Sequence, residues 1–399
     1  MQASKAKGAR SHAAAAAGAI ALLALVIGVA NPARGTDGAP DPLAGGDLSA
    51  TVDVAATTKA AMARLGGDYG GAWIDRSSGT PVLEIAAAGS ENLAAVASGL
   101  IAEPGVELVA ADTGLAELER GRDRALDALP KGTPRPIAID ADPSRGAVVI
   151  SAAGIDPAAQ ARIASAAGIP VLLEGEDALT AELVKDACPV CYPPWRAGVP
   201  IRSGRALCTG AFTVLQGKRH KHKFRALTAG HCQTDRRSVH ASHRRVGRIT
   251  RNSFRGERRV AADALRFKIP RRQRRARLAL PPPDGDVPVI GKLPDRALVP
   301  GQYLCFSGRT TGGGCGYLTR DDIALRIGKK TFTHLWCVGV PTRPGDSGGP
   351  VVQPRDDGAV RAAGLVDITL QTNTTDEMCF SSIELVLQKM DVRLLSARR

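Results

Sequence analysis

Residues 345–350 read Gly-Asp-Ser-Gly-Gly-Pro, and residues 227–232 read Leu-Thr-Ala-Gly-His-Cys. A serine hydroxyl is a weak nucleophile until a base takes its proton and donors stabilise the oxyanion that forms. The glycines beside Ser347 allow the N–H groups of Gly345 and Ser347 to point into one oxyanion hole, and the Ala-Gly corner positions His231 as the base. A plain glycine turn or a core histidine explains either motif alone. The two together indicate a serine hydrolase.

A third residue, a carboxylate, must hold the imidazole in one tautomer and stabilise the imidazolium. Asp263 opens the run Asp-Ala-Leu-Arg-Phe-Lys-Ile, whose alternating apolar positions predict a strand. Such a strand would bury Asp263 beside His231. Asp235 is an alternative, but it follows His231 by four residues in a polar loop. We therefore expect a triad of His231, Asp263 and Ser347.

From about residue 200 onward the chain consists of short apolar runs separated by Gly and Pro turns, which favours an all-β barrel or sandwich. The last apolar run, 381–395, has helical spacing, and Ser381 or Ser382 can cap it. The expected strands are 210–216, 224–229, 246–250, 263–269, 287–291, 302–307, 315–319, 332–338, 349–353 and 361–368.

Segment 305–317 reads Cys-Phe-Ser-Gly-Arg-Thr-Thr-Gly-Gly-Gly-Cys-Gly-Tyr. With the order His, Asp, Ser, it makes 200–399 resemble the S1 family of chymotrypsin-like serine peptidases, specifically the streptogrisin and alpha-lytic branch. The resemblance implies two antiparallel six-stranded β-barrels with a C-terminal helix and the active site between the barrels. It also implies three disulfides, which are Cys208–Cys232, Cys305–Cys315 and Cys337–Cys379.

The region 51–185 predicts a small α+β unit. Two hairpins, 70–86 and 136–152, share one plan, and helical sequence follows each, at 114–129 and after Asp156. More weakly, 55–180 resembles the branch's pro-region, which assists folding and blocks the active site until it is removed. Residues 1–195 carry 15 basic and 23 acidic residues, net −8, and the rest carry 38 and 16, net +22. These opposite charges suit an acidic pro-region bound to its own basic peptidase domain.

The first 30 residues predict an export signal, because a basic start precedes an apolar stretch that ends in small residues at Gly28 and Ala30. An uncleaved anchor is the alternative, since roughly 18 apolar residues can just cross a bilayer. After cleavage we expect a secreted chain with no membrane contact. Residues 31–50 are interpreted as a flexible spacer, and the Pro-rich 186–200 as a linker and processing region.

All eight cysteines lie at or after residue 188, and an even number in an exported protein suggests disulfides. Two remain after the implied pairs. Cys188 and Cys191 form a small disulfide or half of a zinc site, which would also need His220 and His222. We favour the disulfide and expect no cofactor. The histidines outside the triad are otherwise expected on the surface or in a core, namely His220, His222, His240, His243 and His334.

The sequence departs from the family around the substrate. The strand that pairs with substrate backbone normally reads Gly-Leu-x-Ser-Gly-Gly, whereas residues 364–369 read Gly-Leu-Val-Asp-Ile-Thr. The loss of both glycines narrows the pocket entrance, and Asp367 adds a carboxylate near the imidazole. The residues expected at the substrate pocket are Leu335, Trp336, Asp367, Ile368 and Thr369. A blocked pocket would instead leave a protease-like binding protein of the cell envelope, weakly active or inactive.

Two basic runs, 218–223 and 271–277, can bind polyanions or simply form a solvated surface. With 44% hydrophobic residues the chain can form cores and is not disordered as a whole. The sequence thus predicts a secreted serine endopeptidase made as a preproenzyme. Its expected partners are a protein or peptide substrate, its own pro-region and, weakly, a polyanion.

Overall fold

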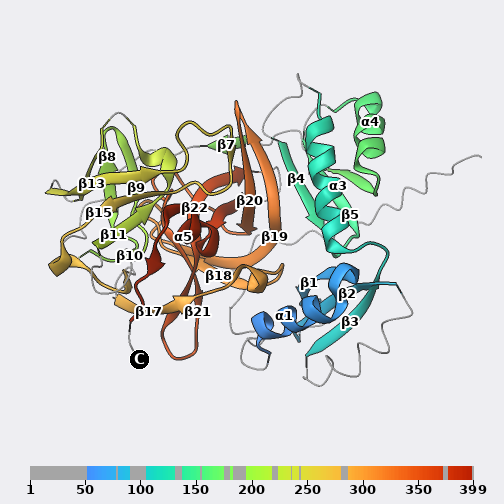
Figure 1. Cartoon of the computed structure of the whole chain (residues 1–399), viewed down its shortest axis with the longest axis horizontal. Helices are drawn as coiled ribbons and strands as arrows, with labels where there is room; N and C mark the ends of the chain where they lie inside the picture. Colours follow the sequence, from blue (N-terminus) through green and yellow to red (C-terminus); the bar gives the residue numbers. More distant parts are fainter. Residues whose placement is uncertain are drawn as a thin grey trace, which may run out of the picture. The chain divides into compact units, whose positions relative to one another are not determined.

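The protein is described from a computed structural model that is mostly β-structure with few helices (Figure 1). The predicted signal, spacer, Asp235, Cys188 and Cys191 lie outside the described residues. Among the described helices, none is long and apolar enough to cross a membrane. The described residues are 52–77, 80–89, 105–130, 137–152, 155–174, 180–182, 195–217, 223–234, 236–241, 244–279, 286–371 and 376–397.

The region before residue 183 contains one helix and then the predicted repeat. In each copy a hairpin is extended by a third strand that runs parallel to its second strand, and the helices α3 and α4 carry the helical sequence expected after each hairpin. Asp156 accepts the Ala159 N–H at 2.8 Å and Pro157 begins α4, which confirms the predicted helix start. The elements are α1 (Val54–Leu65), β1 (Tyr69–Asp75), β2 (Val82–Ala88), β3 (Val106–Ala111), α3 (Leu115–Ala128), β4 (Ile137–Asp142), β5 (Ala147–Ser151), α4 (Pro157–Ala167), β6 (Val171–Glu174) and β7 (Thr180–Glu182).

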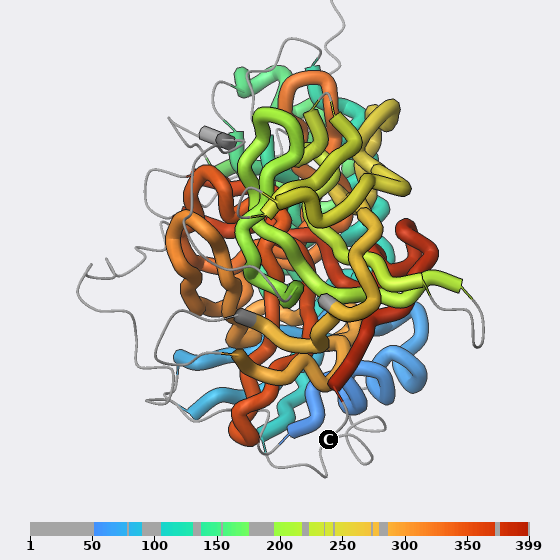
Figure 2. Tube along the Cα trace, turned by 90° about the vertical axis from the view of Figure 1, so that its left-hand side faces the viewer, coloured from blue at the N-terminus to red at the C-terminus, as the bar shows by residue number. Residues whose placement is uncertain are grey.

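From residue 195 onward the described chain forms two large sheets. The first has the order β24-β10-β11-β15-β13-β12-β8-β9, and β11 and β15 run side by side in both views (Figures 1 and 2). Its strands are β8 (Pro200–Ser203), β9 (Ala206–Thr209), β10 (Thr213–Gln216), β11 (Lys223–Thr228), β12 (Ser238–Ala241), β13 (Arg244–Asn252), β15 (Leu265–Lys268) and β24 (Arg393–Leu394).

The second sheet has the order β14-β20-β23-β22-β21-β18-β19-β4-β5-β6, with β16, β17 and β7 attached to it through β22. It is mostly antiparallel, but β14–β20, β17–β22 and β5–β6 are parallel pairs. Its strands after residue 195 are β14 (Arg259–Val260), β16 (Arg277–Ala279), β17 (Asp286–Lys292), β18 (Tyr303–Phe306), β19 (Gly314–Ile327), β20 (Lys330–Val338), β21 (Pro350–Pro354), β22 (Val360–Gln371) and β23 (Asp376–Ser382).

Every strand expected after residue 200 coincides with an observed strand, although seven further strands were not predicted (β8, β9, β12, β14, β16, β23 and β24). The arrangement as two barrels of six strands stays a prediction, because the observed sheets are larger and the second includes strands from the N-terminal region. The domain boundary at 186–200 is likewise untested. Trp195 is fully buried and packs edge-on against Phe267 at 5.1 Å, so the core already includes residue 195.

The C-terminal helix is shorter than the predicted 381–395. Helix α5 covers Ile383–Met390, and Ser382 caps it by accepting the Leu385 N–H at 3.3 Å. Asp391 ends it with a left-handed φ of 51°. The residues beyond leave the helix because Leu394 pairs with Val214 as strand β24. Ser381, the other candidate cap, is fully buried and accepts the main-chain N–H of Asp263 instead.

Three disulfides join the predicted pairs, Cys208–Cys232, Cys305–Cys315 and Cys337–Cys379. The first ties β9 to the short 3-10 turn η3 (Gly230–Cys232) that carries His231. The second joins β18 to β19, and the third joins β20 to β23. Each bond therefore braces a strand or turn that the candidate site uses.

Candidate active site

His231 and Asp263 are in direct contact. The backbone N–H of His231 donates to Asp263 Oδ1 at 3.0 Å, and the ring Nδ1 lies 2.5 Å from Oδ2. The Asp263 side chain is fully buried, and 8% of the His231 side chain is exposed. Since an ionised carboxylate only accepts hydrogen bonds, Nδ1 carries the proton. This leaves Nε2 as the basic nitrogen, and it has no hydrogen-bond partner among the described residues.

Gly230 makes this contact possible. A Cβ at residue 230 would lie 2.7 Å from Asp263 Oδ1 and 2.6 Å from the Phe254 Cβ. Asn252 donates to the Gly230 carbonyl at 2.9 Å and so fixes the turn. Only glycine lets the turn approach the buried carboxylate this closely, which explains the Ala-Gly corner in the sequence.

The main chain of Asp263 is held on both sides. Its N–H donates to Ser381 Oγ at 3.1 Å. Ser253 Oγ lies 2.6 and 2.9 Å from the Ala262 and Ala264 carbonyl oxygens, so its single hydrogen can bond either of them. The predicted alternation of the following strand is confirmed, because Leu265, Phe267 and Ile269 are all buried in one cluster.

Ser347 lies between β20 and β21 in a loop shaped by two glycines of positive φ, Gly345 at 105° and Gly348 at 79°. A Cβ on Gly348 would lie 2.0 Å from Thr228 Oγ1, so this loop packs directly against the segment that leads to His231. The Ser347 carbonyl also accepts the Thr209 N–H at 2.9 Å. The main chain of Ser347 is thereby seated beside the His231 turn.

The buried carboxylate of Asp346 organises the same loop. Asp346 Oδ1 accepts the N–H groups of Thr310 and Thr311 at 2.9 and 3.2 Å, and Oδ2 accepts that of Arg343 at 2.9 Å. The neighbouring N–H groups of Gly345 and Ser347 donate to no group in the hydrogen bonds between described residues. Two free donors on a rigid loop are what an oxyanion hole requires.

The structure thus joins His231 to Asp263 and brings the Ser347 main chain to the same turn, but His231 Nε2 and the Ser347 hydroxyl are not hydrogen-bonded. Cys208, His231 and Cys232 also lie within ligand distance of one another. The sulfurs of Cys208 and Cys232 are bonded to each other in a disulfide, so neither is a thiolate that could bind a metal.

The residues expected at the substrate pocket are buried in β20 and β22. Leu335 and Ile368 belong to one apolar cluster, and Trp336 faces another and stacks near Phe380. Thr369 Oγ1 shares a hydrogen bond with Thr342 Oγ1 at 2.6 Å. β20 and β22 both pair with β23, so these residues lie in the same part of the sheet, distributed over its two faces.

Asp367 is 1% exposed and lies beside Asp263. Its Oδ2 contacts Ser381 Oγ, and its Oδ1 has no hydrogen-bond partner among the described residues. Burial raises the pKa of the Asp367 carboxyl well above its usual range, and the negative charge of Asp263 raises it further. The sequence placed a carboxylate here but did not reveal the link through Ser381.

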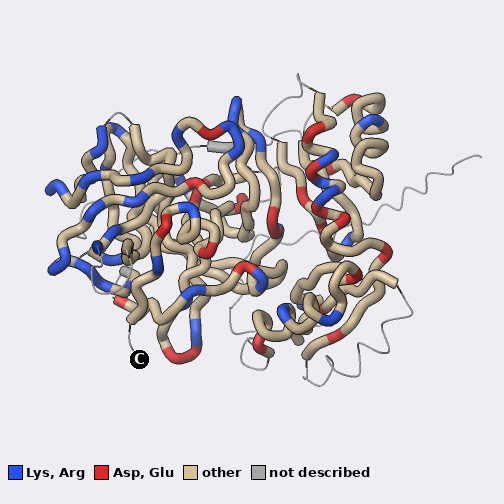
Figure 3. The backbone as a smooth tube through the Cα atoms, in the orientation of Figure 1, with Lys and Arg blue, Asp and Glu red and all other residues tan. Residues whose placement is uncertain are grey.

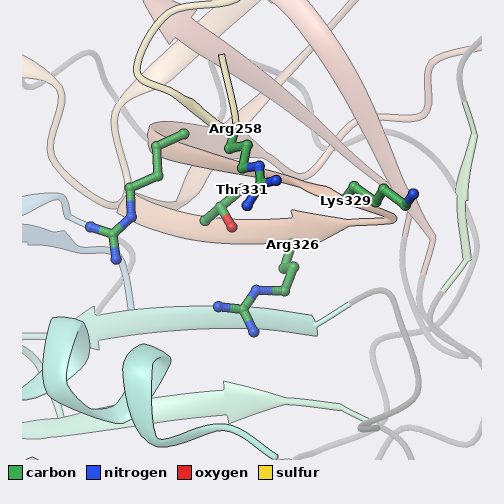
Figure 4. A pocket seen from close by; sticks show the side chains of 5 residues that line it. Arg258, Arg326, Lys329 and Thr331 are labelled. Atoms are coloured by element: carbon green, nitrogen blue, oxygen red, sulfur yellow. The ribbon is translucent and has the colours of Figure 1, made fainter. Parts of the chain in front are cut away.

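A strongly basic cavity of about 480 Å³ is lined by none of the triad residues (Figure 4). Strand pairing assembles it, because Thr331 on β20 pairs with Arg259 on β14 and with Arg326 on β19. Arg259 bonds Asp127 of α3 at 2.8 Å, and an Arg326 N–H reaches the Leu126 carbonyl at 3.5 Å. The lining residues are Arg258, Arg259, Arg326, Lys329 and Thr331. The basic run 271–277 singled out in the sequence does not line it, and residues 218–222 of the other run lie outside the described residues.

The search of protein-family models and the search of curated proteins found no match. Among solved structures, about half of the chain is similar to several serine proteases. Thermobifida fusca protease A is 24% identical with a TM-score of 0.42, over 51% of this chain and 98% of that one. Nocardiopsis protease is 22% identical with a TM-score of 0.42, over 50% and 98%. Cellulomonas bogoriensis chymotrypsin is 24% identical with a TM-score of 0.40, over 51% and 98%.

Proposed function

We propose that this chain is a secreted serine endopeptidase, made as a preproenzyme, that hydrolyses peptide bonds through His231, Asp263 and Ser347. The observation that carries the proposal is the double contact between His231 and Asp263, which leaves Nε2 basic and unpartnered beside the Ser347 loop. Hydrogen bonds of a catalytic site are often long before substrate binds, so the missing bond between Nε2 and the Ser347 hydroxyl is compatible with this role.

In the proposed reaction, Ser347 Oγ attacks the peptide carbonyl carbon and His231 Nε2 takes the hydroxyl proton. The carbonyl oxygen becomes an oxyanion held by the N–H groups of Gly345 and Ser347. His231 then gives its proton to the leaving amine, which departs and leaves an ester on Ser347. Water, deprotonated by His231, hydrolyses this acyl-enzyme and restores the hydroxyl. Asp263 stabilises the imidazolium throughout, and no cofactor is needed.

The region before residue 183 fits the role of a pro-region in two ways. β4 pairs with β19 and so extends a sheet of the peptidase part. β7 pairs antiparallel with β22, where Glu182 lies opposite Thr369 on the strand expected to bind substrate backbone. A segment in that position would exclude substrate. The basic character of the strands after residue 195, visible in Figure 3, suits docking of an acidic segment.

Fluorophosphonate labelling tests the hydrolase proposal. The wild-type protein should react covalently at Ser347, and Ser347→Ala should abolish both labelling and peptide hydrolysis while the protein stays folded. Ser307→Ala, at another buried serine in a loop, is the matched control and should keep the label. Labelling that survives Ser347→Ala would exclude Ser347 as nucleophile. A wild-type protein that is never labelled would favour the inactive, protease-like binding protein, which Asp367 and Ile368 in the strand expected to bind substrate suggest.

The basic cavity favours polyanion binding as a second function. Four of its five lining residues are cationic, and one of them, Arg259, pairs with Asp127. Replacing Arg258, Arg326 and Lys329 by Gln should lower the salt concentration that elutes the protein from heparin. Replacing Arg271, Arg272 and Arg275 removes the same charge elsewhere and serves as the control. Equal shifts for both triple variants would mean diffuse attraction without a site.

A further inference from the structure

Asp367 sits at an irregularity of β22 next to the active site. Val366 pairs with Phe380 and Ile368 with Cys379, and the register shifts between them, so Asp367 has no partner in β23. A β-bulge of this kind re-aims one side chain out of the regular alternation. The carboxyl of Asp367 is thereby buried against Ser381 and close to Asp263.

Ser381 connects the two carboxyl-bearing residues. Its Oγ accepts the main-chain N–H of Asp263 at 3.1 Å and also contacts Asp367 Oδ2. A serine hydroxyl has one hydrogen and two acceptor positions. Asp367 therefore determines which way the Ser381 hydroxyl points, and Ser381 in turn holds the main chain of Asp263.

The charges around Asp367 allow only one of the two carboxyls to be ionised easily. A negative charge is less costly on Asp263, because its two oxygens lie at hydrogen-bond distance from the main-chain N–H and the ring Nδ1 of His231, whereas Asp367 Oδ1 has no partner among the described residues. Within the described part of the chain, two charged or titratable groups face Asp367. The first is Asp263, in the segment before β15, and the second, beyond Asp263, is His231 of η3. Strand β23 presents the neutral Ser381 to Asp367, and no Lys or Arg pairs with Asp367 among the described ion pairs. Two adjacent buried anions without a cation are strongly disfavoured.

A neutral carboxyl also agrees with the hydrogen bonds. Asp367 Oδ1 is buried without a partner. An anion would leave that oxygen charged and desolvated, whereas a protonated group pays a much smaller penalty. The raised pKa of Asp367 described above points in the same direction.

We propose that Asp367 is a positioning residue that works as a neutral carboxyl, orienting Ser381 so that Asp263 stays against His231. This inference rests on the proposed hydrolase function. Loss of the Asp367 proton at alkaline pH adds a second negative charge beside Asp263, which disturbs the His231–Asp263 contact. Activity therefore falls at alkaline pH. A side chain at position 367 that cannot ionise does not produce this alkaline decline.

The test compares wild type, Asp367→Asn, Asp367→Ala and Ser381→Ala in the complete secreted protein. The first readout is the rate of fluorophosphonate labelling of Ser347 between pH 6 and 11. The second is the low-field proton NMR resonance of His231 Nδ1–H, which needs no catalytic activity. Asp367→Ala and Ser381→Ala should lower the labelling rate at pH 7 about tenfold or more, and Asp367→Asn should restore most of it.

Wild type should also lose at least about tenfold in labelling rate at alkaline pH, and the low-field resonance should weaken over the same range. In Asp367→Asn both should persist. The proposal is overturned if Asp367→Asn retains the wild-type alkaline decline, or if all three variants match wild type at every pH. If wild-type protein is never labelled, the hydrolase proposal fails. The role of Asp367 is still tested in that case, because the NMR resonance reports whether Asp367 controls the His231–Asp263 contact.

Discussion

Asp263 holds His231 by two bonds of different kinds, one to the main-chain N–H at 3.0 Å and one to the ring Nδ1 at 2.5 Å. The first bond would survive in an asparagine, because an amide oxygen also accepts. The second would not, because an NH₂ group facing Nδ1 forces that nitrogen to accept and moves the ring proton to Nε2. The pair therefore fixes the tautomer as well as the place of the ring.

Asp263→Asn should fold normally and lose roughly 10⁴-fold in kcat, because Nε2 can no longer take a proton. Peptide hydrolysis measured beside thermal unfolding checks this. Asp376→Asn, at the start of β23, changes a carboxylate away from the site and is the control. Activity within tenfold of wild type for Asp263→Asn would mean that Asp263 does not set the tautomer.

Gly348→Ala should destabilise the protein strongly. The residue has a φ of 79°, and its new Cβ would lie 2.0 Å from Thr228 Oγ1 and 2.6 Å from the Ala229 nitrogen. Gly358 has a similar φ of 69° but open space around it, so Gly358→Ala isolates the backbone cost of about 1–2 kcal/mol. Overpacking should bring the loss at Gly348 to about 3 kcal/mol or more by urea unfolding. Equal losses for both variants would show that the Ser347 loop is not packed against the His231 turn.

Much of this site was predictable because it is written in local motifs. The glycines at 230, 345 and 348 appear in the sequence as Ala-Gly-His and Gly-Asp-Ser-Gly. The strand after Asp263 was predicted from its alternating apolar and polar residues. The three disulfide pairs came from the family resemblance and are confirmed.

The other features of the site depend on which strands pair with one another. The local sequence pattern does not encode that pairing. Ser381 and Ser382 are equivalent as helix caps in the sequence, and only the pairing of β23 with β22 sends Ser381 to Asp263 and leaves Ser382 as the cap. Arg258 and Arg326 are far apart in the chain, and the unpredicted strand β14 brings them to one cavity. The bulge at Asp367 leaves no trace in the apolar pattern.

The three disulfides should differ in their contribution to stability. They close loops with sequence separations of 42, 24 and 10 residues, for Cys337–Cys379, Cys208–Cys232 and Cys305–Cys315. In the chain-entropy model a longer loop constrains the unfolded state more, so replacing the 42-residue pair by alanines should cost about 1 kcal/mol more than replacing the 10-residue pair. Urea unfolding of Ser347→Ala protein measures both without self-digestion. The reverse order would show that native packing, rather than loop closure, sets their effects.

The stability of the whole chain should fall as pH rises toward neutrality because of Asp140 on β4. This carboxyl is buried and its Oδ1 has no hydrogen-bond partner among the described residues. Burial raises its pKa to about 7, against the lowering effect of Arg320. The other charged groups that face it are Asp142 of its own strand, Arg122 of α3, Asp321 of β19 and Glu377 of β23.

The folded chain therefore keeps a proton on Asp140 that the unfolded chain loses above about pH 4. The contribution of Asp140 to the free energy of unfolding is therefore most favourable below about pH 4. It declines between about pH 4 and 7 and is constant above that range. Asp140→Asn in Ser347→Ala protein should raise the Tm at pH 8 by at least about 2 °C and leave it nearly unchanged at pH 4. Asp356→Asn, at an exposed loop position, is the control and should change neither value. An equal gain for Asp140→Asn at both pH values would show that the residue acts through packing and not through its proton.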